Sequence, residues 1–292
     1  MIRITFRDGE VCGEAELKGR IAVYLDNDSI IDLSKGPAGR RDHFLAAVKR
    51  GATLLFSLTN AIEVAGPQGA SAAAVEAFLD GIGPRWIPLE LNPWKAVRKE
   101  QDGAGPQSPV SKEFIAGFVP DRMHEMSPEG SKILDLSPEA FFKLSAVVQW
   151  ERKRRAEWPP DEPSESERLD ESLRERIAAH RTDFERDPAS LDRALPVLPF
   201  AAAQPATFAL SSLLRLLVLE SRSHQFKKND GIDFCHAVLA SAYAHIITLD
   251  RQWKRRVCAL PRPNGLAEVY YRAELDAFLE RLDWLVTSRA AG

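Results

Sequence analysis

Cysteines and long apolar segments are scarce in this sequence, and both absences exclude classes of protein. The three cysteines, Cys12, Cys235 and Cys258, form no Cys-x-x-Cys pair, which argues against a disulfide scaffold or a zinc ribbon. No window approaches the roughly 18 uncharged apolar residues of a membrane span, since even 209–219 contains Arg215. Because no signal-like apolar stretch opens the chain, we expect a cytoplasmic protein.

An excess of positive charge is also lacking. The 39 Lys and Arg residues are balanced by 42 Asp and Glu residues, giving a net charge of −3. This balance argues against a broadly basic nucleic-acid binder but leaves room for a local basic patch. The chain does have length and apolar content: 292 residues, 45% of them hydrophobic, suffice for one large domain or two small ones and exclude general disorder.

Apolar runs rich in strand-forming residues alternate with helical patterns over 21–91. The expected strands are 21–26, 53–57 and 86–91, and the expected helices are 43–49, 60–65 and 71–79. Such alternation predicts an α/β fold with a mostly parallel sheet covered by helices on both faces. Residues 1–18 are expected to form one or two short edge strands around the turn Arg7-Asp8-Gly9.

The middle of the chain, 92–205, has few strand-like runs and is rich in proline and charge. Helices are expected over 140–157 and 164–185, separated by the breaker at 158–163. Its dense charges, including the basic run 152–155, favour solvated and salt-bridged helix faces over a binding surface.

The α/β pattern resumes after this region. A helix is expected over 210–221, a second from Asn229 or Asp230 to about His245, a strand over 246–250 and a closing helix over 267–287. The sequence therefore predicts a discontinuous α/β domain, 1–91 and 206–292, interrupted by a mainly helical insertion, 92–205.

Acidic residues follow the expected strands. Asp26 and Asp250 end the first and last of them, and the carboxyl ends of parallel strands form the ligand crevice of an open sheet. Glu63 lies six residues after Ser57, on a helix that leaves the second strand on the same side. Asp233 opens the helix that leads into the last strand, so its place depends on the fold.

These acids stand in four local motifs whose order resembles the PIN-domain family. The motifs are Leu-Asp26-Asn-Asp28-Ser, Leu-Leu-Phe-Ser57 ahead of Glu63, Asp230-Gly-Ile-Asp233-Phe-Cys-His236, and Ile-Ile-Thr248-Leu-Asp250. The resemblance covers 19–91 and 211–257 and implies a PIN-like parallel sheet with flanking helices. It further implies a metal-dependent endoribonuclease in which Mg²⁺ or Mn²⁺ is held by four acids: Asp26, Glu63, Asp233 and Asp250.

Several neighbours of these acids are expected to support the site. They are Asp28, Asp230, Ser57 and Thr248, and Asp28 departs from the family, which commonly has a neutral polar residue there. His236 is interpreted as a hydrogen-bonded packing residue in preference to a cleft residue. Just past Asp250, two interpretations stay open: either Trp253, Lys254 and Arg255 hold a substrate strand by stacking and phosphate contact, or a packed tryptophan stands beside solvated charges.

Two other functions compete with a nuclease. The chain could be a catalytically inactive PIN-fold module whose acids cap helices and whose insertion binds a protein, or a phosphatase acting on small phosphoesters. The presence of all four acids favours the nuclease, with RNA as the expected substrate and single-stranded DNA as the second choice. Because family members are often toxins held by an antitoxin, the resemblance also suggests an inhibitory protein partner.

Overall fold

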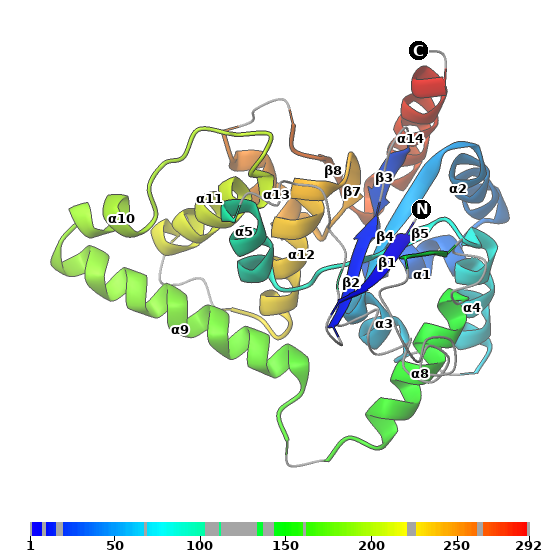
Figure 1. Ribbon diagram of the computed structural model, residues 1–292, viewed down its shortest axis with the longest axis horizontal. Coiled ribbons are helices and arrows are strands. Elements are labelled where there is room, and N and C mark those ends of the chain that lie inside the picture. The colour runs from blue at the N-terminus through cyan, green and yellow to red at the C-terminus, as the bar shows by residue number, and fades with distance from the viewer. Residues whose placement is uncertain are drawn as a thin grey trace.

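The protein is built on a five-stranded, all-parallel sheet, shown by a computed structural model (Figure 1). The described residues are 2–7, 10–15, 20–66, 69–102, 111, 133–136, 143–159, 162–220, 226–261 and 265–290. The strands of the sheet are β3 (Ile21–Tyr24), β4 (Ala52–Ser57), β5 (Trp86–Leu89), β7 (Ile246–Thr248) and β8 (Glu268–Tyr270). The α/β class predicted from the alternation is confirmed.

The strand order β5-β4-β3-β7-β8 contains a switch point at its centre. From β3 the chain builds outward through β4 to β5, and it later returns to the other side of β3 to add β7 and then β8. In open parallel sheets, ligands bind outside the carboxyl ends of the strands where the order reverses. The carboxyl ends of β3 and β7 are therefore the place where this fold can build a site.

Helices cover both faces of the sheet (Figure 1). On one face lie α1 (Asn27–Lys35), α2 (Ala38–Arg50), α3 (Leu58–Val64), α4 (Ala70–Ile82), α8 (Leu144–Ala156) and α14 (Leu275–Ala290). On the other lie α5 (Pro93–Gln101), α9 (Glu165–Arg186), α10 (Ala189–Ala194), α11 (Pro205–Leu219), α12 (Asp230–Tyr243) and α13 (Arg251–Ala259).

The pleat of the strands divides their side chains between these two layers. Along β3, Ala22 and Tyr24 join the core under α12, whereas Ile21 and Val23 join the core under α1 and α2. All four residues are buried, which explains why the strand appears in the sequence as a continuous apolar run.

The first strands form a second, smaller sheet. β1 (Ile2–Arg7) pairs antiparallel with β2 (Glu10–Ala15) on one side and with β6 (Ile133–Leu136) on the other. The expected hairpin strands are therefore present, but they do not form an edge of the main sheet. Asp8 and Gly9 of the expected turn lie outside the described residues.

The closing helix was predicted too early, at 267. Residues Glu268–Tyr270 instead form β8, which pairs with β7, and a single 3-10 turn, η3 (Arg272–Glu274), precedes α14. Val269 and Tyr270 are good strand formers. The edge of β7 offers their backbone hydrogen bonds that no local periodicity reveals.

Helices from the middle of the chain pack on the rest of the fold. α9 contacts α11 and α12, and α8 contacts α3 and α4. The predicted start of α9 is confirmed, because Ser164 and Glu167 form a capping box. α8 lies within the range 140–157 expected for a helix, of which 140–142 are outside the described residues. The division into a discontinuous domain and an insertion stays a prediction. Within the described ranges, no helix combines the length and apolar character needed to cross a membrane.

Candidate metal and substrate site

A pocket of about 300 Å³ lies at the carboxyl ends of β3 and β7. Six acidic residues line it: Asp26, Asp28, Glu63, Asp230, Asp233 and Asp250. All four acids identified through the resemblance are among them, although they come from four different segments of the chain. The fold thus brings the predicted site residues to one place, at the switch point of the sheet.

Asp26 is fixed at the start of α1. Its Oδ1 accepts from Ser29 N (3.1 Å) as the N-cap of that helix, and also from Thr248 Oγ1 (2.9 Å). The backbone N–H of Asp26 in turn donates to Thr248 Oγ1 (3.0 Å). Thr248 is fully buried at the end of β7. Through these two hydrogen bonds its hydroxyl links Asp26 to the neighbouring strand, and this is the contact by which Thr248 would support the site.

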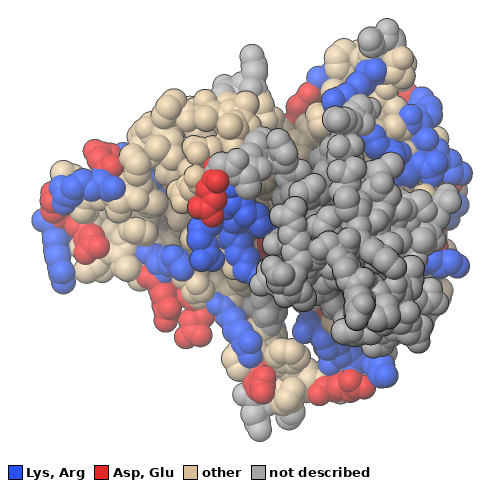
Figure 2. Space-filling model, in the orientation of Figure 1, with Lys and Arg blue, Asp and Glu red and all other residues tan. Residues whose placement is uncertain are grey.

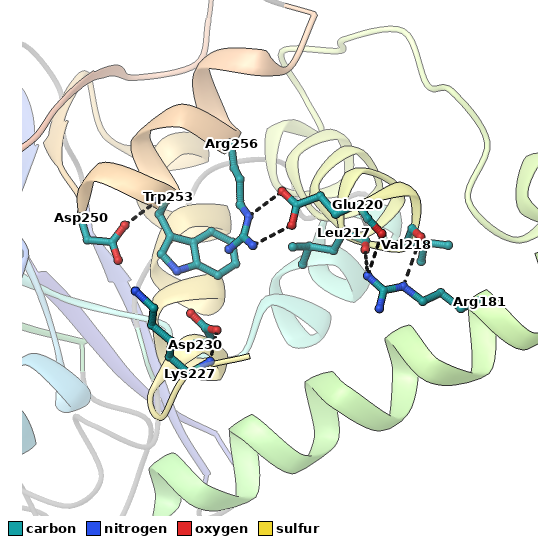
Figure 3. Close-up of polar contacts among 9 residues, drawn as sticks. All are labelled: Arg181, Leu217, Val218, Glu220, Lys227, Asp230, Asp250, Trp253 and Arg256. Carbon is teal, nitrogen blue, oxygen red and sulfur yellow. Dashed lines mark hydrogen bonds and ion pairs between the residues drawn. The ribbon is translucent and has the colours of Figure 1, made fainter. Parts of the chain in front are cut away.

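Asp250 stands at the equivalent position after β7. Like Asp26 it lies two residues past its strand, and its Oδ1 caps α13 by accepting from Trp253 N (2.6 Å; Figure 3). The side chain is otherwise exposed to the pocket. Both strand-end acids therefore serve as helix caps and still line the pocket.

Asp233 and Asp230 lie in the first turn of α12. The helix starts one residue after Asn229, so Asp233 is its fourth residue, and its side chain accepts no capping hydrogen bond from the described residues. Asp230 is buried and its Oδ2 accepts from Lys227 N (2.6 Å). Asp233, three residues further along the same turn, also lines the pocket.

Glu63 lies in the last turn of α3. The capping box at the start of that helix is made by Ser57 and Asn60, so Glu63 is not the capping partner of Asn60. Its half-buried side chain lines the pocket and makes no hydrogen bond or ion pair with any residue that the structure describes.

Mutual proximity and burial raise the pKa values of these carboxyl groups. Burial, followed by the charge of Asp250 and then that of Glu63, raises the pKa of Asp233 to about 8. Burial and the charges of Asp26 and Asp28 raise the pKa of Glu63 to about 7. The pKa of Asp26 is also raised, mainly by burial, although its hydrogen bonds from Ser29 and Thr248 oppose the shift. The pocket therefore brings together carboxyl groups whose ionisation is opposed by burial and by one another.

The donor set suits Mg²⁺ or Mn²⁺, although the side chains do not form a closed cage. Among the described residues, no three Asp, Glu, His or Cys side chains are placed as a ready metal-ligand group. Mg²⁺ usually retains several waters and binds through one or two carboxylates, so it does not require such a group. Carboxylate oxygens are the hard ligands it prefers, and their raised pKa values indicate a site that a cation would stabilise.

Titration with Mn²⁺ is therefore expected to raise the melting temperature. A ligand that binds only the folded state stabilises it by about 2.7 kcal/mol at one hundred times its Kd. The measurement is a thermal unfolding series across a millimolar range of MnCl₂, with D250N as the variant that loses a carboxylate but keeps an N-cap residue. An unchanged melting temperature in the wild type would contradict a metal site here.

Replacement of Thr248 by Val should weaken the site without touching the pocket lining. Asp26 would lose both the hydroxyl that donates to Oδ1 and the acceptor of its own N–H, and unpaired buried groups cost about 1–3 kcal/mol each. Residues that hold a metal ligand in place typically affect metal affinity by about 10–100-fold. Urea unfolding and Mn²⁺ titration of T248V measure the two effects, and T248S, which keeps the hydroxyl, should restore both.

His236 is a packing residue that also borders the pocket. Its Nε2 lies 2.9 Å from Ser57 Oγ and 2.5 Å from Thr59 Oγ1, and its ring packs on Tyr24 with centroids 5.2 Å apart. Burial lowers the pKa of His236 to about 3, so the ring is neutral at physiological pH. Ser57, expected to support the site, is fully buried in this network and makes no direct contact with the pocket.

For Trp253, the structure decides between the two interpretations of the segment after Asp250. Trp253 is only 1% exposed and packs against Phe234 and the guanidinium of Arg256, so no base can stack on its face. Lys254 forms an ion pair with Glu274. The packed-tryptophan alternative holds for Trp253, while Arg255 is exposed and its role in substrate binding stays a prediction.

Three residues of the site region were not predicted from the sequence. Lys227 and Lys228 line the pocket beside the acids, and Asp170 of α9 bonds to the turn that carries them. The adjacent lysines directly before Asn229-Asp230 were a local signal that could have been used. Asp170 had none, because its partners are about sixty residues away in the chain.

The fold and the pocket define an α/β protein with an acidic site at the switch point of a parallel sheet. Comparisons with protein-family models, with curated proteins and with solved structures gave no match to this chain. Any statement about activity must therefore come from the residues and their geometry.

Proposed function

We propose that the protein is a metal-dependent nuclease of the PIN type, acting as an endoribonuclease. The observation that carries the proposal is the convergence of Asp26, Glu63, Asp233 and Asp250 on one pocket at the carboxyl ends of β3 and β7. These are the four positions picked out by the resemblance in sequence order.

Two pocket acids that cap no helix favour an active site over an inactive binding module. Asp26 and Asp250 do cap helices, as the inactive alternative requires, but Glu63 and Asp233 cap nothing. Their raised pKa values mean that their ionisation opposes folding. A purely structural role gives no reason to keep two such carboxylates at the same pocket.

Asp26, Glu63, Asp233 and Asp250 would hold the metal. When bound, Mg²⁺ or Mn²⁺ supplies a Lewis acid that lowers the pKa of water and stabilises negative charge on phosphate oxygens. The chain's own residues fix the geometry: Thr248 orients the Asp26 carboxylate, and the Trp253 backbone N–H orients that of Asp250. In the metal-free pocket the Glu63 carboxylate takes up a proton near neutral pH, and a bound cation would favour its ionised form.

The test is cleavage of a mixed RNA pool by purified protein with Mn²⁺, and with EDTA as the control. p-Nitrophenyl phosphate in a parallel assay separates the phosphatase alternative, which shares the metal chemistry. Metal-dependent cutting of RNA without phosphomonoester hydrolysis would support the proposal. Absence of cutting of RNA and of single-stranded DNA by the folded protein would overturn it.

A further inference from the structure

The turn before α12 carries two lysines into the wall of the acidic pocket. Lys227 and Lys228 both line the pocket and are exposed. Neither lies within ion-pair distance of a described carboxylate, although six acidic residues line the same pocket. Lys228 also lines an adjoining pocket with Glu167 and Glu171 of α9, and its charge contributes to lowering the pKa of Glu167. In Figure 3 the Lys227 side chain extends from the turn towards the side of the pocket where Asp250 and Trp253 lie. Lys227 thus places a cation in the acidic pocket, and Lys228 places a second one between this pocket and the acidic residues of α9.

The backbone of this turn is held at several points. Lys227 N donates to Asp230 Oδ2 (2.6 Å), Asn229 N donates to Asp170 Oδ2 (2.8 Å), and Gly231 N donates to Asp170 Oδ1 (2.7 Å). Asn229 has a φ of 77°, a left-handed conformation that Asn tolerates better than most residues. The lysines therefore stand on a fixed backbone.

Helix α9 supplies this support by docking closely on α12. Asp170 is buried on α9, and a Cβ added at Gly231 would lie 2.4 Å from the carbonyl carbon of Leu169, so the two helices meet backbone to backbone. At the other end of α9, Arg181 donates to the carbonyls of Leu217 and Val218 at the end of α11 (Figure 3). A helix from the predicted insertion thus sets the position of the two lysines.

A third donor in the same wall also lacks a partner. The Trp253 indole Nε1 is buried without a hydrogen-bond acceptor among the described residues, and Trp253 lines the pocket. Because this N–H is fully buried, it offers no donor to a ligand in the pocket. The two ammonium groups are therefore the donors that the pocket offers to an anion, beside carboxylates that suit cations.

We infer that Lys227 and Lys228 bind the phosphates of a single-stranded RNA next to the acidic cluster, and that Asp170 is the positioning residue that holds them there. The inference rests on the proposed nuclease function, since it assigns the substrate side of the same pocket. Lysine ammonium groups bind phosphate as point charges and need no base-specific contact. The inserted region then contributes to substrate binding through α9.

The test measures binding of a fluorescein-labelled single-stranded RNA by anisotropy, with Ca²⁺ in place of Mn²⁺, over a range of salt concentrations. K227Q/K228Q is expected to weaken the affinity about 10-fold or more and to flatten the salt dependence, because each phosphate contact contributes about 0.7 to its slope. The control is K35Q/K49Q, which removes the same charge from exposed positions on α1 and α2 that do not line the pocket. D170A should reproduce the weaker binding, whereas D170N, which keeps one acceptor oxygen, should retain part of the affinity.

Stabilisation by Mn²⁺ separates this inference from the proposed function. K227Q/K228Q should retain the Mn²⁺-dependent rise in melting temperature, because neither lysine is a metal ligand. An unchanged salt slope in K227Q/K228Q, in a wild type that cleaves RNA, would overturn the assignment of the lysines and leave the nuclease standing. A wild type that neither responds to Mn²⁺ nor cleaves RNA would overturn the nuclease, and this inference with it.

Discussion

Metal-dependent RNA cleavage should fall by at least about 100-fold when either Asp26 or Asp233 is replaced by Asn. Metal ions supply several kcal/mol of transition-state stabilisation, and each 1.4 kcal/mol corresponds to a factor of about ten in rate. Asn retains the size and hydrogen-bonding ability of Asp but removes the negative charge. The measurement is the initial rate of RNA cleavage in saturating Mn²⁺.

The two variants test the same charge in different structural settings. Asn is as good an N-cap as Asp, so D26N keeps the cap of α1 and isolates the loss of the carboxylate. Asp233 caps nothing, so D233N removes no helix contact at all. The matched control is D183N, an exposed carboxylate on α9 outside the pocket, which should leave the rate unchanged. Retained activity in both pocket variants would refute a catalytic role for the cluster.

The surface charge fits a site that is local. On the face shown in Figure 2, acidic and basic side chains of the described residues alternate on the left and at the bottom, and basic side chains predominate at the upper right alone. This agrees with the sequence, whose net charge of −3 argued against a broadly basic binder. Affinity for a polyanion must then come from a few placed cations and from the metal.

The parts of the fold that the sequence revealed are those whose burial is complete. β3 and β4 appear as continuous apolar runs because both of their faces are covered by helices. α9 was predicted from its helical pattern after the breaker at 158–163, and the structure adds a capping box at its start. In contrast, β8 has three residues and is a strand only because β7 lies beside it, a pairing that local sequence does not contain.

The short helices α1 and α13, whose N-caps are the acids at the strand ends, were not predicted from the sequence. α1 and α13 each have nine residues and begin directly after Asp26 and Asp250, so the acids that signal a site are also the helix caps. The place of Asp233 could not be predicted locally either. It is set by the contact between α9 and α12, through Asp170 and Gly231, which joins parts of the chain about sixty residues apart.

The metal-free protein is expected to become more stable when Asp233 is replaced by Asn, and the gain should grow with pH. The pKa of Asp233 is about 8 in the folded protein, well above the value of about 4 for an unfolded chain. The folded state therefore binds a proton at the Asp233 carboxylate more tightly than the unfolded state does. Its stability relative to D233N falls as the pH rises from about 4 to about 8 and is constant above that.

The size of the effect makes it measurable by thermal unfolding in EDTA. Each unit of pKa shift corresponds to about 1.4 kcal/mol, so the penalty is on the order of a few kcal/mol, and D233N should melt roughly 5 °C or more above wild type at pH 8.5. At pH 4.5 the two proteins should melt together. The comparison between variants is needed because His236, with its pKa lowered to about 3, makes the protein less stable as the pH falls below about 6.5 and so opposes the trend in either protein alone.

Adding Mn²⁺ should reverse the order of the two proteins. A cation bound by the pocket offsets the repulsion among Asp233, Asp250 and Glu63 in the wild type, whereas D233N has lost one of the carboxylates that would hold it. Wild type should then gain several degrees at pH 8.5 and D233N little. If D233N is less stable than wild type in EDTA at pH 8.5, the raised pKa is wrong, and the carboxylate is a structural group whose charge the fold already accommodates.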